Sequence, residues 1–412
     1  MKINLRYKLQ IFLPMFLTLI FVSKGLPQHR STGILGGVKN ISKTALAKMQ
    51  LGSYILHARD GYLSKVSVEK TLLPQDPKNR PQAANIIKTA EDILYVIQPT
   101  TVSISSNGGR SWKSHSVPAL EGHWQVLNDG TFIRVDVLLK DDKGPARVFQ
   151  SSDHGRSWKL LSTIPIQVPK NYTERFSVYF GLKKLSDDTL FYGMEVRDIQ
   201  FEGEPQKSAI KSRTTRLELY RSNDGGKKWT GSIPVCQWCS EGGIARLPSG
   251  NLFATIRYQR GRLPSDPPNI LDSPDGEKIP PPYQHLFSIE SQDDGLTWKN
   301  HRQLTTVFGQ CYGYPAVQSD GTVVVIHDTR SGPLPNAARA MISYDAGKHW
   351  EDEAYYLFYG KGTTGYSQSV TLSDDTIVTV GGFSNYTDHD RNSPPSWTGN
   401  SRLIVIRWKP NK

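Results

Sequence analysis

Short apolar runs separated by polar turns cover most of this chain. Examples are 101–104 (Thr-Val-Ser-Ile), 217–220 (Leu-Glu-Leu-Tyr) and 285–289 (His-Leu-Phe-Ser-Ile), each followed directly by a polar turn. Runs of four to eight residues bounded by turn signals are typical of strands. Almost no helical periodicity appears after the N-terminal segment, so the pattern predicts an all-β chain.

Five of the turns share one eight-residue pattern, Ser-x-Asp-x-Gly-x-x-Trp. The copies lie at 105–112, 151–158, 222–229, 291–298 and 343–350, and the first carries Asn107 in the Asp place. A fixed module that recurs at intervals of 46 to 71 residues indicates a repeat fold. In each copy we expect Asp to accept backbone N–H groups, Gly to take a positive φ and Trp to pack beneath. Each turn should therefore end one strand and start another.

A second kind of turn, a short Asp/Gly-type hairpin between apolar strands, interleaves with the first. Its copies lie at 89–94, 127–132, 185–190, 247–252, 318–323 and 372–377. Each of the first five precedes one eight-residue turn, and the sixth precedes only a final strand at 402–408. The simplest solution is a six-bladed β-propeller with four strands per blade. The last blade would borrow a strand from the region near 52–58, which closes the ring and removes an exposed edge.

The N-terminus has the pattern of a secretory signal. Residues 1–25 combine basic positions with an apolar stretch at 9–22, which is short for a membrane span. An uncleaved anchor is the alternative. Residues 26–45 form a polar leader, and 46–412 form the propeller. We therefore expect a secreted or periplasmic protein without a stable membrane span.

Net charge limits the classes of binding partner, and cysteine spacing limits the chemistry of the cysteines. The formal net charge is +12, and the chain remains basic after the signal at 1–25 is removed. A basic surface favours anionic partners, but no nucleic-acid recognition motif is present, so an acidic glycan or glycoconjugate is the expected partner. The pair Cys236-x-x-Cys239 lacks the further ligands of a zinc site, so we expect a disulfide, with Cys311 left over. Nothing requires a metal or another cofactor.

Strand direction predicts which residues share a face. Both kinds of turn should lie on one face, because strands within a blade are antiparallel. The opposite face then collects starts of first strands, ends of second strands and starts of third strands. The residues placed there are Ala83, Glu121, Tyr179, Glu241, Tyr312, Tyr366, Arg197, Arg257, Arg330 and Arg339. Arginine, glutamate and tyrosine gathered on one rim indicate a binding site, although any single one could serve packing.

These patterns resemble the sialidase (neuraminidase) superfamily. The five Ser-x-Asp turns are similar to its Asp-boxes, or BNR repeats, and cover most of residues 85–412. The segment 240–257 resembles the family segment that holds a tyrosine-activating Glu and one substrate-binding Arg, which places Glu241 and Arg257 in those roles.

Two further positions complete the resemblance. The run Gly365-Tyr366-Ser367 resembles the strand that carries the family's tyrosine nucleophile, and Arg339 stands where another substrate-binding arginine belongs. The resemblance implies a retaining glycoside hydrolase of exo-α-sialidase type, with Tyr366 activated by Glu241. Arg257 and Arg339 would bind the carboxylate of a terminal acidic sugar, helped by Arg330 and Arg197.

The chain departs from the family pattern at two places. The first arginine motif has Gln82 at the aligned spot, with Arg80 two residues earlier, and the loop 98–101 lacks the acid. Asp328 and Asp198 are the candidate replacement acids. His123 and His327 are other candidate proton donors, although a lone histidine is more often structural. A non-catalytic carbohydrate-binding propeller and an acidic-polysaccharide lyase or hydrolase of other specificity therefore remain open alternatives.

Overall fold

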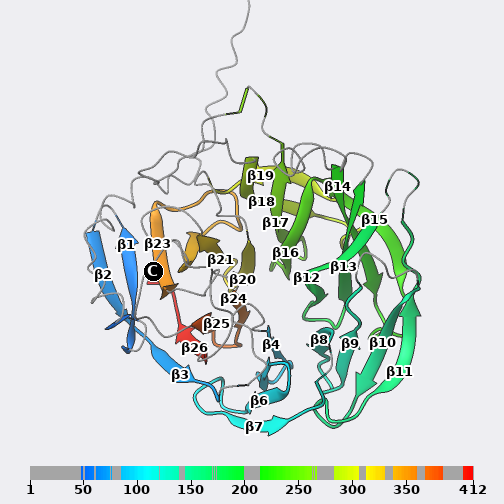
Figure 1. The fold of residues 1–412 in the computed structure, drawn as a ribbon. Coiled ribbons are helices and arrows are strands. Elements are labelled where there is room, and N and C mark those ends of the chain that lie inside the picture. Colours follow the sequence, from blue (N-terminus) through cyan, green and yellow to red (C-terminus); the bar gives the residue numbers. More distant parts are fainter. Residues whose placement is uncertain are drawn as a thin grey trace, which may run out of the picture.

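The computed structural model describes residues 48–49, 52–59, 62–74, 76, 85–119, 121–138, 144–168, 170, 172, 174–198, 214–261, 263, 265–266, 283–305, 312–329, 337–359, 367–383 and 402–411. Within these ranges the chain is nearly all β, and its strands form six sheets. The sheets stand side by side around a ring, which confirms the six-bladed β-propeller (Figure 1).

The first four blades each consist of four consecutive strands, numbered outward from the axis. Blade 1 holds β4 (Asn85–Lys88), β5 (Leu94–Ile97), β6 (Thr101–Ser105) and β7 (Lys113–Ser116); blade 2 holds β8 (His123–Val126), β9 (Phe132–Val135), β10 (Ala146–Ser151) and β11 (Lys159–Ile164). Blade 3 holds β12 (Glu174–Lys184), β13 (Leu190–Asp198), β14 (Thr214–Ser222) and β15 (Thr230–Gln237); blade 4 holds β16 (Cys239–Arg246), β17 (Leu252–Arg260), β18 (Tyr283–Ser291) and β19 (Lys299–Gln303).

The last two blades combine strands from both ends of the chain. Blade 5 holds β20 (Gly313–Val317), β21 (Val323–Thr329), β22 (Ala337–Ser343) and β23 (Glu353–Tyr359), extended by β1 (Tyr54–Arg59) and β2 (Tyr62–Ser67). Blade 6 holds β24 (Ser367–Thr371), β25 (Ile377–Phe383), β26 (Arg402–Trp408) and, outermost, β3 (Glu69–Leu72).

The ring closes with an N-terminal strand, but the predicted segment was wrong. The strand that completes blade 6 is β3, which pairs with β26, whereas the region near 52–58 forms β1 and pairs with β23 of blade 5. A buried contact stabilises the second pairing, because His57 Nε2 lies 2.7 Å from a carboxylate oxygen of Glu353. Blade 5 therefore gains two strands that the repeat pattern did not contain.

The five eight-residue turns join third and fourth strands, as predicted. In blade 2, Ser151 Oγ accepts the N–H of Gly155 at 3.0 Å, and Asp153 Oδ1 accepts the N–H of Ser157 at 2.9 Å. The Trp158 indole donates to the Gly155 carbonyl at 3.0 Å. Gly155 has φ 83°, and a Cβ there would lie 2.6 Å from Trp124, so the turn requires glycine.

The six hairpins lie on the same face as these turns. Arg246, at the end of β16, donates to Asp294 of the eight-residue turn in blade 4 at 2.8 Å, and to Asp187 of the blade 3 hairpin at 3.0 Å. One side chain thus joins both kinds of turn across two blades. This confirms the predicted strand polarity and leaves the opposite face for the other loops.

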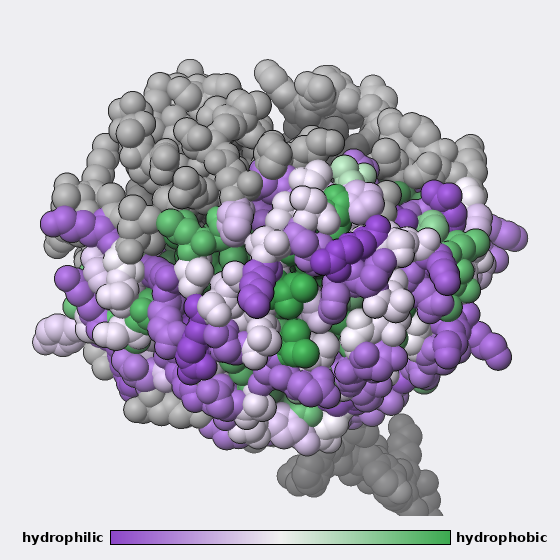
Figure 2. All heavy atoms as spheres, turned by 90° about the horizontal axis from the view of Figure 1, so that it is seen from below, coloured by the Kyte–Doolittle hydropathy of each residue, from purple (hydrophilic) through white to green (hydrophobic). Residues whose placement is uncertain are grey.

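The hydrophobic core is divided into layers between neighbouring blades. Between blades 2 and 3, for example, Ile133 and Val148 pack with Leu190 and Tyr192, and equivalent clusters fill the other five spaces. The outer strands β7, β11 and β19 are mostly exposed. The side of the molecule in Figure 2 is accordingly hydrophilic over most of its area, with scattered hydrophobic positions.

The described residues lack two features, a membrane-spanning helix and a cluster of metal ligands. They contain no helix that is both long and apolar enough to cross a membrane. They also contain no group of three or more His, Cys, Asp or Glu residues suited to holding a metal ion.

Candidate functional site

A polar pocket of about 160 Å³ lies between blades 3 and 4. Its lining residues come from strand ends opposite the turns: Glu195, Arg197, Thr215, Trp238, Ser240, Glu241, Arg257 and Gln259. Three of the site residues predicted from the sequence, Glu241, Arg257 and Arg197, are therefore brought together here. Their shared location follows from the strand polarity, since each lies near the end of its strand on that face.

An irregularity in β16 places Glu241. The pairing of β16 with β17 shifts register between Cys239 and Gly242, and Glu241 lies inside this bulge. Bulges commonly re-aim a side chain next to a functional site. Gly242 makes the bulge possible, because a Cβ there would lie 1.8 Å from the backbone oxygen of Thr255.

Glu241 and Gln259 are two of the groups that hold Arg257. Its Nη1 donates to Glu241 Oε2 at 3.0 Å, while Nε and Nη2 donate to Gln259 Oε1 at 3.1 and 2.6 Å. The side chains of Arg257 and Glu241 are each 18% exposed, so the pair is accessible from the pocket yet largely shielded from solvent. An arginine held by both sides of its fork keeps a fixed orientation.

A second arginine–glutamate ion pair lies in the pocket. The sequence predicted its arginine but not its glutamate. Arg197 Nε donates to Glu195 Oε1 at 2.6 Å, and its guanidinium lies 4.1 Å from the ring centroid of Phe176. Glu195 was not identified because only Arg197 stood at a predicted strand end. Alternation of side chains along β13 could have identified Glu195, because it places residues 195 and 197 on the same face of the sheet.

Trp238 supplies the aromatic wall of the pocket. It lies between Cys236 and Cys239, which form a disulfide, as the sequence predicted. Its backbone has φ 57° and is held on both sides, with its N–H donating to Thr215 at 2.5 Å and its carbonyl accepting from Gln259 at 2.8 Å. The disulfide and these bonds hold the Trp238 backbone, and the Trp238 ring lies edge-on to the Tyr258 ring with the two centroids 6.3 Å apart.

The predicted residues of blade 5 lie apart from this lining. Arg339 is 2% exposed, and its guanidinium lies 4.9 Å from the ring centroid of Tyr356. Asp328 is fully buried, and its Oδ1 accepts the Tyr312 N–H at 2.8 Å. His327, also buried, has Nδ1 3.0 Å from the Asp328 carbonyl.

His123, the other candidate proton donor, lies at the start of β8 on the inner side of blade 2. Its Nδ1 accepts the Gly181 N–H at 3.1 Å. Burial, with a contribution from the nearby charge of Lys183, lowers the pKa of His123 to about 3. The imidazole is therefore neutral near pH 7, with its proton on Nε2.

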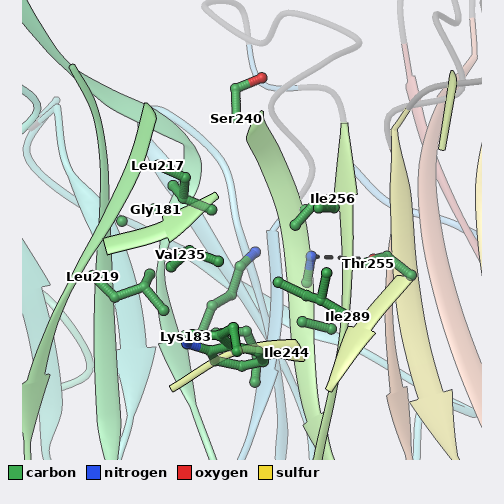
Figure 3. A pocket seen from close by; sticks show the side chains of 15 residues that line it. Gly181, Lys183, Leu217, Leu219, Val235, Ser240, Ile244, Thr255, Ile256 and Ile289 are labelled. Carbon is green, nitrogen blue, oxygen red and sulfur yellow. Dashed lines mark hydrogen bonds between the residues drawn. The ribbon is translucent and has the colours of Figure 1, made fainter. Parts of the chain in front are cut away.

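A smaller apolar cavity of about 30 Å³ lies between the same two blades and shares Ser240 with the polar pocket. Figure 3 shows Lys183 of β12 beside Val235 and Ile244 in this cavity. The Lys183 Nζ lies 4.8 Å from the ring centroid of Tyr314 in β20, a strand of blade 5. Burial lowers the pKa of Lys183 to about 7 and raises that of Tyr314 to about 12.

Several predicted positions fall outside the described residues. These are Tyr366, Arg330, Ala83, Gln82, Arg80 and Cys311, together with the N-terminal segments 1–25 and 26–45. For Asp198 and Tyr179 the structure describes the backbone, within β13 and β12, but not the side chain. Glu121, at the start of blade 2, lines a different cavity.

The polar pocket has the groups for acid–base chemistry and for binding polar ligands. Two carboxylates, Glu195 and Glu241, offer proton acceptors, and two arginines offer forked donors. Trp238 adds an apolar surface to a lining that is otherwise mostly polar. Proton transfer, substrate orientation and ring packing could all occur within this one pocket.

Comparison with known proteins identifies the fold. No family model and no curated protein sequence matches the chain. Among solved structures, the α-L-arabinofuranosidase of Fusarium graminearum is similar at 17% identity and TM-score 0.53, over 83% of this chain and 98% of that one. A Hadza microbial sialidase is similar at 15% identity and TM-score 0.51, over 79% of this chain and 65% of that one. A protein of unknown function from Dyadobacter fermentans gives 15% identity and TM-score 0.52, over 83% and 98%.

Proposed function

We propose that this chain is a propeller glycoside hydrolase that removes a terminal acidic sugar from glycoconjugates, as exo-α-sialidases do. The observation that carries the proposal is the Glu241–Arg257 pair, 3.0 Å apart in a polar pocket on the face opposite the turns. Its fold is shared with a sialidase and an arabinofuranosidase, which makes glycan hydrolysis the natural chemistry to test. The signal pattern at 1–25 makes secretion or periplasmic export part of the same proposal.

The reaction would proceed in two steps. Tyr366 would attack the anomeric carbon while Glu241 takes the phenolic proton, and an acid, Asp198 or Asp328, would protonate the departing oxygen. Water would then release the sugar with retained configuration, with the same groups acting in reverse. A neutral tyrosine suits a substrate that carries a carboxylate, because a carboxylate nucleophile would be repelled by it.

Arginines would bind the substrate carboxylate. Arg257 lines the pocket and already points one edge of its fork at Glu241, and Arg197 lies on the opposite wall. Arg339 and Arg330 would approach from blade 5. Forked donors that remain charged at every working pH are suited to a carboxylate.

A second candidate function follows from the charge balance of the pocket. Each of its arginines already faces a glutamate, Arg257 with Glu241 and Arg197 with Glu195. This pairing weakens the attraction for an anionic substrate and leaves two carboxylates in one pocket, the arrangement used by hydrolases of neutral sugars. The second candidate is therefore an exo-acting hydrolase of a neutral sugar, with Glu195 and Glu241 as its two carboxylates.

A substrate screen tests the proposal. The protein is incubated with 3′-sialyllactose, with arabino-oligosaccharides and with uronate polymers, and products are analysed for released sugar, reducing ends and unsaturated ends. Release of sialic acid supports the first candidate, and release of a neutral sugar supports the second. Unsaturated ends would identify a lyase, and binding without any product would identify a carbohydrate-binding propeller.

Two variants make the screen specific. Glu241→Gln should lower turnover by about a hundredfold or more, because the proton acceptor is lost while the size is kept. Glu91→Gln is the matched control, since Glu91 is exposed in the blade 1 hairpin on the turn face. Equal turnover of the Glu241→Gln variant and the native protein would rule out the assigned site.

A further inference from the structure

Blade 2 carries a second polar cavity, of about 440 Å³. Its lining residues are Glu121, Arg134, Asp136, Val137, Leu138, Gly144, Pro145 and Arg147. They lie at the start of β8, along and just after β9, and at the start of β10, so the cavity opens on the same face as the candidate site. The two linings share no residue, because the candidate site lies between blades 3 and 4.

A fixed network of charges builds this cavity. Asp136 accepts from Arg134 Nη1 at 3.0 Å through one carboxylate oxygen, and from Arg147 Nε at 2.7 Å through the other. Arg134 also donates to the Glu121 carbonyl at 2.7 Å, and its guanidinium lies 4.2 Å from the ring centroid of Phe149. Only 7% of the Arg134 side chain is exposed, so the network is rigid on its inner side.

Part of this polar capacity is unused. Arg147 is 64% exposed and uses only its Nε, so its two Nη groups are available. Across the described residues, the Glu121 carboxylate forms no hydrogen bond and no ion pair. The cavity thus presents donors of Arg147 and the carboxylate of Glu121, which no described residue occupies.

The charge balance indicates the ligand. Two arginines and two carboxylates, Glu121 and Asp136, leave no net charge, so an anion gains little from binding here. Guanidinium groups donate hydrogen bonds and the neighbouring carboxylates accept them. Adjacent hydroxyl groups of a sugar, which both donate and accept, match this arrangement. Leu138 and Pro145 add an apolar wall suited to the C–H face of a sugar ring, and the volume falls within the usual range of ligand pockets.

We propose that this cavity is a second saccharide-binding site, which takes a neutral sugar unit of a glycan. The inference rests on the proposed function in one respect, since a glycan-processing protein is the setting in which a separate sugar site is useful. On this reading, the blade 2 cavity holds a neutral part of the glycan while the pocket between blades 3 and 4 holds the terminal sugar that is released.

The test measures binding separately from turnover. Calorimetric titrations use lactose, arabinobiose and 3′-sialyllactose at millimolar concentration on the Glu241→Gln variant, alone and combined with Arg147→Ala or Glu121→Ala. We expect at least one neutral sugar to bind, and each added substitution to weaken that binding at least about tenfold. Arg156→Ala is the matched control, because Arg156 is an exposed arginine of the same blade on the turn face.

The outcomes separate this inference from the proposed function. Neutral-sugar binding that needs Arg147 and Glu121, in a protein that releases no sugar, upholds the second site and defeats the hydrolase. Sugar release combined with neutral-sugar binding that is unchanged by both substitutions defeats the second site alone. The neutral-sugar site is also overturned if none of the three sugars binds. It is overturned as well if Arg147→Ala weakens the binding of 3′-sialyllactose alone.

Discussion

Arg257 and Glu241 face each other across the first two strands of blade 4, with 3.0 Å between Nη1 of the arginine and Oε2 of the glutamate. The same guanidinium is held on its other edge by Gln259. One arginine therefore connects the candidate base to the end of β17, and its planar fork is required for both contacts.

Replacing this arginine by lysine tests the importance of the fork. Arg257→Lys keeps the charge, but an ammonium cannot contact Glu241 and Gln259 with the same geometry. We expect kcat/KM to fall about a hundredfold while the melting temperature changes little. Steady-state kinetics check this, with Arg156→Lys on the turn face as the control. An unchanged kcat/KM would show that the Arg257 geometry does not serve the reaction.

The two candidate functions differ in their nucleophile. If the substrate is an acidic sugar, Tyr366→Phe should abolish turnover, because the phenolic oxygen forms the covalent intermediate. If the substrate is a neutral sugar, Glu195→Gln should lower turnover by about a thousandfold and Tyr366→Phe should have a small effect. Kinetics on the best substrate from the screen separate the two, and full activity in both variants would contradict both mechanisms.

The bulge that places Glu241 depends on Gly242. Gly242→Ala would put a Cβ 1.8 Å from the Thr255 oxygen, a backbone atom that cannot move aside cheaply. We expect a loss of about 3 kcal/mol in the free energy of unfolding and a loss of activity, because β16 must shift.

Gly144→Ala is the stability control for this change. A Cβ at Gly144 meets nothing within 4 Å, so its effect should stay within about 0.5 kcal/mol. Denaturant unfolding measures both variants. Equal stability of the two would show that β16 does not need glycine at this position.

The disulfide is expected to support Trp238 more than the whole fold. Cys236→Ser combined with Cys239→Ser opens a very short loop, so the free energy of unfolding should fall by about 2 kcal/mol. KM should rise, because the Trp238 ring is no longer fixed in the pocket, while kcat changes less. Reductant should reproduce the effect in the native protein and have none on the double variant. Reductant sensitivity in the double variant would point to another thiol.

Lys183 should make stability depend on pH in the alkaline range. Burial lowers its pKa to about 7 in the folded state, against about 10.4 in an unfolded chain. Between these values the unfolded state binds more protons, so Lys183 makes the free energy of unfolding rise as pH increases from about 7 to about 10. Lys183→Met should lack this rise.

Denaturant unfolding at pH 7 and pH 9.5 checks the Lys183 prediction. As pH rises, the free energy of unfolding of the native protein should increase relative to that of the Lys183→Met variant. Lys159→Met is the control, because Lys159 is exposed on the outer strand β11. Parallel pH curves for Lys183→Met and the native protein would show that Lys183 is not held neutral.

The sequence predicted the repeat architecture well because turns carry strong local chemistry. Glycine with positive φ, as at Gly155, and an aspartate that accepts backbone N–H groups, as Asp153 does, are local requirements visible in the chain. Strand polarity then brought Glu241 and Arg257 to one pocket. Neither step needed knowledge of contacts between distant residues.

The failures concern contacts that no local pattern reports. Both β1 and β3 are short apolar-polar runs, and which of them pairs with β26 is decided by the packing of the closed ring. Glu195 was missed because its role arises from its position beside Arg197 in the folded sheet. The substrate-binding role of Arg339 stays a prediction, and its side chain is buried beside Tyr356, outside the lining of the polar pocket.

The placement of β1, β2 and β3 has a consequence for how the chain is made. β1 can pair with β2 at once, but β23, the other partner of β1, and β26, the partner of β3, are synthesised hundreds of residues later. Until then the second edge of β1 and the paired edge of β3 lack their native partners, and pairings of such long range form slowly. Closure of the ring therefore has to wait for β26, and until β23 and β26 are synthesised the open edges of β1 and β3 are available for non-native pairing.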